Sequence, residues 1–214
     1  MALRKRRTPT SELQAELDAS APSKPTKSLF DPRDKKVMVL GLQGSGKTYL
    51  SRELVKRNGL RVLVYTPHLH DFRDEPDEHF LVYQPFAVDN ERFFRQAKAL
   101  AQRGEIDGVL IDEFELVFKN VHELGPAAMD VMANHRHYGM MLIGISRRAQ
   151  DIPAYIFESS AYVVSFALQA PNAKRKLNEL SDGFGDLVSK LDYESREFYV
   201  KAIGRAPQRF GRLV

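Results

Sequence analysis

The chain has 214 residues, of which 43% are hydrophobic and 28% charged, enough for one globular domain with extensions. It has no cysteine, which excludes disulfide bonds and thiolate metal sites and fits a reducing compartment. The formal net charge of +4 is concentrated at the ends, in the RKRR cluster at 4–7 and in Lys201, Arg205, Arg209 and Arg212. Basic ends on a nearly neutral body predict either a polyanionic partner or solvated tails that keep the protein soluble.

The first 30 residues combine Pro9, Pro22 and Pro25 with Ser, Thr, Ala and Lys, and contain few large apolar side chains. Such a segment buries too little surface to offset its chain entropy, so residues 1–30 are predicted to be a mobile basic tail. No apolar run approaches the roughly 20 residues that cross a bilayer, and no signal-peptide pattern opens the sequence. We therefore expect no membrane-spanning segment and a cytoplasmic protein.

From residue 36 onward, short Val, Ile and Leu runs alternate with amphipathic stretches. Continuous apolar strands separated by helices indicate a mostly parallel sheet covered on both faces. The predicted strands are 36–40, 61–67, 80–85, 108–113, 140–146, 161–166 and 196–204, and the predicted helices are 48–57, 89–104, 125–139 and 172–180. The sequence thus predicts a three-layer α/β domain over 31–204, followed by a basic C-terminal tail at 205–214.

The stretch GLQGSGKT at 41–48 joins the first predicted strand to the first predicted helix. Its glycines let the backbone fold closely around a phosphate, and successive N–H groups from 44 to 48 would point at an anion beside the helix N-terminus. The Lys47 side chain would reach the β- and γ-phosphates, and the Thr48 hydroxyl would bind Mg²⁺. The predicted nucleotide-binding residues of this P-loop are Gly41, Gly44, Ser45, Gly46, Lys47, Thr48 and Tyr49.

A second motif, GVLIDEFELVF, is an apolar strand that ends in Asp112 and Glu113. In P-loop NTPases an aspartate at this position holds the Mg²⁺ shell, and an adjacent glutamate can act as the general base toward water. The alternative is an acidic strand end that caps the next segment. The spacing of roughly 65 residues from the P-loop favours the catalytic interpretation. The pair also favours hydrolysis over phosphoryl transfer to a small acceptor.

The third motif, MMLIGISRRAQDIP, is an apolar strand that leads into Arg147, Arg148 and Gln150. In additional-strand (ASCE) NTPases the inserted strand lies between the P-loop strand and the Asp-Glu strand, so its end approaches the γ-phosphate. Arg147 or Gln150 is the candidate γ-phosphate sensor, and Arg148 would act in the same subunit or across an interface. The alternative is that these arginines are simply solvated at a strand end.

The order GLQGSGKT, VLIDEFE and SRRAQDIP, followed by YIFESSAYVVSF, resembles the FtsK/HerA superfamily of DNA-pumping ATPases. The resemblance covers residues 36–166, and in length the chain is similar to the small genome-packaging ATPases of membrane-containing and archaeal viruses. Much of the family has a glutamine at the end of the third strand, where this chain has Arg147.

This resemblance implies a RecA-like ASCE fold, ATP and Mg²⁺ as cofactors, and double-stranded DNA as a partner. It also implies a ring, expected to be a hexamer, in which an arginine of one subunit completes the site of the next. Arg136 in NHRHYG is a candidate for that arginine finger, and Arg148 competes with it. Capsid vertex proteins are further expected partners, in the host cytoplasm or in the virion.

Other ATPase classes share some of these motifs. The chain has no NKxD, which a GTPase needs to recognise guanine, and the Asp-Glu pair argues against a nucleotide kinase. An AAA+ helicase loader would use 172–191 as a helical lid containing Arg175, whereas a strand at 196–204 favours the FtsK/HerA interpretation. A zonula-occludens-toxin-like phage ATPase and a slowly hydrolysing DNA-binding switch also remain open. We predict an ATP-hydrolysing DNA translocase that packages double-stranded viral DNA.

Overall fold

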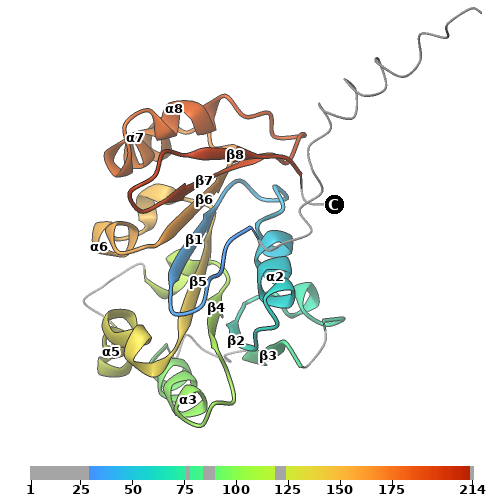
Figure 1. Ribbon diagram of the computed structural model, residues 1–214, viewed down its shortest axis with the longest axis vertical. Helices are drawn as coiled ribbons and strands as arrows, with labels where there is room; N and C mark the ends of the chain where they lie inside the picture. Colours follow the sequence, from blue (N-terminus) through green and yellow to red (C-terminus); the bar gives the residue numbers. More distant parts are fainter. Residues whose placement is uncertain (1–28, 76–77, 84–89, 119–123, 213–214) are drawn as a thin grey trace, which may run out of the picture.

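The computed structural model describes residues 29–75, 78–83, 90–118 and 124–212 (Figure 1). The strands are β1 (Lys36–Leu40), β2 (Val62–Tyr65), β3 (Phe80–Tyr83), β4 (Gly108–Ile111), β5 (Met141–Ser146), β6 (Tyr162–Phe166), β7 (Phe198–Ala202) and β8 (Gln208–Phe210). The α-helices are α2 (Lys47–Arg57), α3 (Asn90–Gln102), α4 (Phe114–Val117), α5 (Pro126–Asn134), α6 (Ala154–Glu158), α7 (Pro171–Leu180) and α8 (Phe184–Ser189). Short 3-10 turns are η1 (Leu69–Asp71), η3 (His135–Tyr138) and η4 (Ala149–Asp151).

The strands form one sheet in the order β3-β2-β4-β5-β1-β6-β7-β8. The strands from β3 to β6 in this order run parallel, and β7 and β8 extend the sheet as antiparallel strands. β5 lies between β1 and β4, which is the predicted place of the additional strand. The predicted three-layer α/β fold with a mostly parallel sheet is confirmed.

Hydrophobic residues fill both faces of the sheet. In β1, Val37 and Val39 pack with the apolar side of α2, whereas Met38 and Leu40 belong to the core formed with α3, α5 and α6. Figure 1 shows α2 on one side of the sheet and α5 and α6 on the other. Because every residue of β1 is buried, the strand that carries the P-loop is fixed from both sides. This burial makes β1 a rigid base for the loop that follows it.

Most of the predicted elements are present, with shorter boundaries. The helix expected over 125–139 ends at Asn134 and continues as the 3-10 turn η3, where the buried His135 ring bonds the Met140 carbonyl at 2.7 Å. This bond spans the turn before β5, in which the helical backbone ends at Gly139 with a φ angle of +64°. The helices α4 and α8 were not predicted, because each is too short to show a clear apolar period.

Of the two predicted tails, the structure describes most of the C-terminal one and only the last residues of the N-terminal one. Residues 1–28 of the predicted N-terminal tail lie outside the described residues. Within the predicted C-terminal tail at 205–214, the structure has Gln208–Phe210 as β8, paired with β7. Arg209 binds Glu197 at 2.6 Å, and the Phe210 ring stacks on Phe198. Over the described part of the chain, no helix is long and apolar enough to cross a membrane.

Candidate active site

A cavity of about 560 Å³ lies at the carboxyl ends of the parallel strands. Its walls come from the loops after β1, β2, β4 and β5. The lining residues are Gln43, Gly44, Gly46, Lys47, Thr48, Tyr49, His68, His70, Asp71, Asp112, Glu113, Ile145, Ser146 and Arg147. In open parallel sheets, ligands bind at this edge, where loops of neighbouring strands converge. The cavity therefore joins the three sequence motifs in one place.

The P-loop backbone forms an open concave turn before α2. Gly44 and Gly46 have φ angles of +74° and +103°, a region that side chains rarely adopt, which explains the need for glycine at both positions. Gly46 is the N-cap of α2, and the first turn of this helix contains no acidic residue. The N–H groups of a first helical turn have no intrahelical acceptor and carry partial positive charge. This geometry suits an anion such as a phosphate.

Lys47 is buried at the base of this turn, with 7% of the residue exposed. Its ammonium donates a hydrogen bond to the Leu42 carbonyl at 2.7 Å. Burial, and to a lesser extent the positive charge of Arg147, lowers the pKa of Lys47 to about 8. Nearby carboxylates offset this effect only in part, so an anionic ligand would stabilise the charged lysine.

Asp112 follows β4 and is almost completely buried. Its carboxylate accepts hydrogen bonds from the Thr66 hydroxyl at 3.3 Å and from the Glu113 backbone N–H at 3.1 Å. Burial, followed by the charge of Glu113, raises the pKa of Asp112. A divalent cation would offset both effects, and the Asp112 carboxylate and Thr48 hydroxyl supply the hard oxygen donors that Mg²⁺ prefers. The residues present therefore fit a Mg²⁺ site.

Glu113 is held in an unusual conformation between two neighbouring strands. Its φ angle is +54°, in the left-handed region that is strained for a residue with a side chain and frequent at functional sites. His68, from the loop after β2, places Nε2 3.2 Å from Glu113 Oε1, and Arg147, after β5, forms an ion pair with the same carboxylate. Because a carboxylate only accepts, the His68 ring donates this hydrogen bond.

The predicted residues outside this cavity are also located. Arg148 and Gln150 are exposed, and Arg148 lies 3.7 Å from Asp151. Arg136 belongs to η3, before the start of β5, at the opposite end of the strand from the P-loop. Gly41 is packed closely, since a Cβ there would lie 2.6 Å from the Ser45 hydroxyl. In this chain alone, Arg136, Arg148, Gln150 and Gly41 do not line the cavity.

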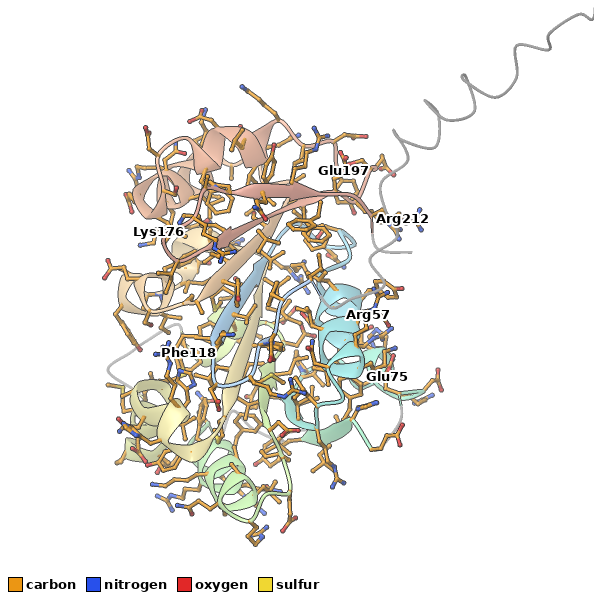
Figure 2. The ribbon with its side chains drawn as sticks, viewed as in Figure 1. Arg57, Glu75, Phe118, Lys176, Glu197 and Arg212 are labelled. Atoms are coloured by element: carbon orange, nitrogen blue, oxygen red, sulfur yellow. The ribbon has the colours of Figure 1, made fainter. Side chains whose placement is uncertain are left out.

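A second cavity of about 480 Å³ adjoins the first and shares Gly46 and Tyr49 with it. Its remaining lining residues are Ser45, Leu50, Phe166, Arg196, Phe198 and Arg212. Figure 2 labels Arg212 beyond β8, on the side of the sheet that carries α2. Aromatic rings and guanidinium groups in one cavity can stack on a flat polar ring system.

Several residues around the site were not predicted from the sequence. Thr66, His68, Tyr193 and Arg196 belong to loops whose sequence contains no phosphate-binding or metal-binding pattern. His68 lies two residues before His70, which precedes Asp71, and nothing in this spacing points to Glu113. Only the pairing of β2 with β4 brings it to the Asp-Glu pair. The sequence signals were local, whereas these contacts depend on the fold.

No protein-family model and no curated protein matches the chain. Among solved structures, the genome packaging NTPase B204 of Sulfolobus turreted icosahedral virus 2, in complex with ATP-gammaS, superposes with a TM-score of 0.69 at 18% identity, over 86% of this chain and 100% of B204. B204 of Sulfolobus turreted icosahedral virus gives 0.70 at 17% identity, over 86% and 100% of the two chains.

The cytoplasmic domain of the type VII secretion ATPase EccC from Thermomonospora curvata gives a TM-score of 0.61 at 14% identity, over 82% of this chain and 25% of EccC. At these identities the comparisons establish a shared fold. These neighbours include viral genome-packaging ATPases, the group that the sequence motifs resemble, and the predicted RecA-like P-loop fold is confirmed.

Proposed function

We propose that the chain is an ATPase that translocates double-stranded DNA and packages a viral genome into a preformed capsid. The observation that carries this proposal is the single cavity that combines the P-loop, Lys47, Asp112, Glu113 and Arg147. The fold supports it, because the genome packaging NTPase B204, whose structure was solved in complex with ATP-gammaS, shares this fold over its whole length.

In this proposal the backbone N–H groups of 44–48 and the Lys47 ammonium bind the β- and γ-phosphates. Thr48 and Asp112 hold Mg²⁺, which when bound neutralises phosphate charge during transfer. Glu113 accepts a proton from the attacking water, and its fixed position between β4 and α4 orients that water. Arg147 follows β5, which lies between β4 and β1, and from there it senses the γ-phosphate.

The second cavity would receive the nucleoside part of ATP. It begins at Tyr49 and Gly46, where the P-loop passes into α2, and it is lined by aromatic and apolar side chains. Phe166 and Tyr49 would pack against the base, and Arg196 would contribute a planar cation. This arrangement leaves the charged groups of the first cavity to the phosphates.

Subunits would assemble as a ring, proposed to be a hexamer, around the DNA. The finger that completes a neighbouring site would be Arg136 or Arg148, and the exposed side chain of Arg148 is suited to a contact between subunits. Contacts to DNA phosphates would carry little sequence information. We place this activity in the host cytoplasm or the virion, with capsid vertex proteins as further partners.

Two substitutions test the nucleotide chemistry. Lys47→Ala should abolish ATP turnover and weaken MgATP binding, because the buried ammonium is lost. Glu113→Gln should keep MgATP binding within a few-fold of the wild type and reduce turnover at least about 100-fold. Lys56→Ala is the matched control, since this lysine lies on the same helix and pairs with Glu53 outside the cavity. Equal loss of binding in both site variants would contradict the assigned roles.

Duplex DNA tests the coupling to translocation. Turnover should rise on addition of duplex DNA at low salt, and this stimulation should disappear as the salt concentration increases. Measurement of particle mass with and without nucleotide should detect the ring. Turnover that ignores duplex DNA at every salt concentration would exclude the translocase and favour a helicase loader.

A further inference from the structure

The loop between α8 and β7, residues 190–197, lies directly against the P-loop. The Tyr193 hydroxyl donates a hydrogen bond of 2.6 Å to the Gln43 carbonyl, 150 residues away in the chain. A Cβ on Gly44 would lie only 2.7 Å from the same hydroxyl oxygen. Tyr193 therefore touches the peptide unit that joins Gln43 to Gly44.

This contact sets the direction of a backbone N–H group. A trans peptide is planar, so the Gln43 carbonyl and the Gly44 N–H point in opposite directions. A carbonyl held toward Tyr193 aims the Gly44 N–H away from it, and Gly44 lines the cavity of the P-loop. The preceding carbonyl, of Leu42, is held by Lys47 and by the Ser45 N–H, both within the loop itself. The Leu42 carbonyl is thus held by residues of the P-loop, whereas the Gln43 carbonyl is held by Tyr193, from outside the P-loop.

The peptide needs such support because glycine tolerates both signs of φ. A flip of the Gln43–Gly44 peptide meets little steric resistance at Gly44 and would turn the Gln43 carbonyl toward the cavity. A carbonyl oxygen carries partial negative charge and would oppose a phosphate, whereas the N–H attracts one. The orientation of this single peptide therefore decides whether the Gly44 N–H, which attracts a phosphate, or the Gln43 carbonyl, which repels one, faces the cavity.

The loop that carries Tyr193 is itself held by internal hydrogen bonds. Asp192 accepts one from the Glu194 N–H at 3.2 Å and one from the Ser195 hydroxyl at 2.7 Å. The Ser195 hydroxyl in turn accepts the Glu197 N–H at 3.3 Å, just before β7 begins. Side chains that bond nearby backbone fix turns of this kind. The position of Tyr193 is therefore set by the same segment that leads into the sheet.

We propose that Tyr193 is a positioning residue for phosphate binding, which holds the Gln43–Gly44 peptide so that its N–H faces the phosphates. The inference rests on the proposed function, since it assigns a supporting role in the same nucleotide site. Tyr193 acts through the P-loop backbone and has no role in the transfer step. Its loss should therefore weaken phosphate binding and leave the rate of the bound complex largely unchanged.

Tyr193→Phe in the full-length protein removes the hydroxyl and keeps the ring. Loss of one hydrogen bond predicts a rise of about two- to tenfold in the Kd of MgADP and of pyrophosphate. The kcat at saturating MgATP should stay within about twofold, so the KM carries the effect. Tyr155→Phe is the control, because it removes a hydroxyl on α6, which precedes β6 at the edge of the sheet away from the P-loop. This variant should change neither the Kd of MgADP nor that of pyrophosphate.

The amide resonance of Gly44 gives a readout that a general loss of stability does not move. In the nucleotide-free protein it should shift in Tyr193→Phe and not in Tyr155→Phe, and in the wild type it should shift on pyrophosphate addition. Unchanged Kd values in Tyr193→Phe, or a wild-type Gly44 amide that ignores pyrophosphate, would overturn the inference. Absence of ATP turnover in the wild type would refute the proposed function alone, since the pyrophosphate and Gly44 measurements would still decide the role of Tyr193.

Discussion

Lys36, the first residue of β1, carries a buried ammonium at the end of the strand away from the P-loop. The residue is 4% exposed, and Nζ donates to the Ser159 hydroxyl at 2.8 Å and to the Met132 carbonyl at 3.3 Å. Burial, followed by the positive charge of Arg136, lowers the pKa of Lys36 from 10.5 to about 8. The charge on this lysine therefore opposes folding at neutral pH.

The magnitude follows from that difference in pKa. At about 1.36 kcal/mol for each pKa unit, the difference between 10.5 and about 8 corresponds to about 3 kcal/mol lost at pH 7 relative to a neutral lysine. Between the two pKa values the unfolded chain binds more protons than the folded protein, so the free energy of unfolding rises with pH across this window. From pH 7 to pH 9.5 the expected gain is about 2 kcal/mol.

Lys36→Met removes the charge and leaves the Met132 carbonyl without this donor, a loss of about 1–3 kcal/mol. At pH 7 the variant should therefore be as stable as the wild type or slightly more stable. From pH 7 to pH 9.5 the wild type should gain about 2 kcal/mol of stability that the variant does not gain. The difference in Tm between the two proteins should therefore shift by about 4–8 °C in favour of the wild type. Other titrating groups, including Lys47, are common to both proteins, so their effects cancel in the difference.

Urea unfolding of the nucleotide-free protein at pH 7, 8 and 9.5 measures this difference. The exposed Lys190 gives the control, because Lys190→Met should show a gap to the wild type that does not change with pH. A gap between wild type and Lys36→Met that stays constant from pH 7 to 9.5 would refute the account of Lys36 as a charge that burial destabilises.

Three further substitutions test other parts of the structure. Gly108→Ala should lower the free energy of unfolding by about 2 kcal/mol or more, measured by urea, because its Cβ would lie 2.3 Å from the Met141 carbonyl oxygen; wild-type stability would contradict the tight β4–β5 contact. Asp112→Asn should raise the Tm of the nucleotide-free protein by a few degrees, because it removes a buried carboxylate whose pKa is raised. The same variant should need at least about tenfold more Mg²⁺ for nucleotide binding, and an unchanged Mg²⁺ dependence would remove Asp112 from the metal site. Phe210→Ala should lower the Tm by about 2–6 °C and speed amide exchange in β7, because the ring stacks on Phe198; an unchanged Tm would mean that β8 contributes nothing to the fold.

The fold class and the centre of the candidate site could be predicted because their signals are local. The P-loop lies within eight consecutive residues, and the strands on either side of it are continuous apolar runs. Asp112 and Glu113 directly follow such a run, so the carboxyl end of a buried strand was identifiable from sequence alone. Parallel strands place these ends at one edge of the sheet, and the observed cavity joins both motifs there.

The rest depended on contacts between distant segments. Tyr193 meets Gln43 across 150 residues, and no spacing in either segment indicates the other. β8 contains only Gln208, Arg209 and Phe210, a composition typical of a basic tail, and it forms because the backbone of β7 offers a free edge. Short polar strands of this kind are specified by their neighbour in the sheet and not by their own pattern.

The position of β5 has a mechanical consequence. It pairs with β1 over Lys36–Leu40 on one side and with β4 over Gly108–Ile111 on the other, so it cannot slip along its axis without breaking both rows of hydrogen bonds. A displacement of Arg147, after the carboxyl end of β5, can therefore reach η3, before its amino end, only if the whole sheet rotates. In the proposed ring, each subunit should therefore rotate as a rigid body, and deformation should be confined to the interfaces between subunits.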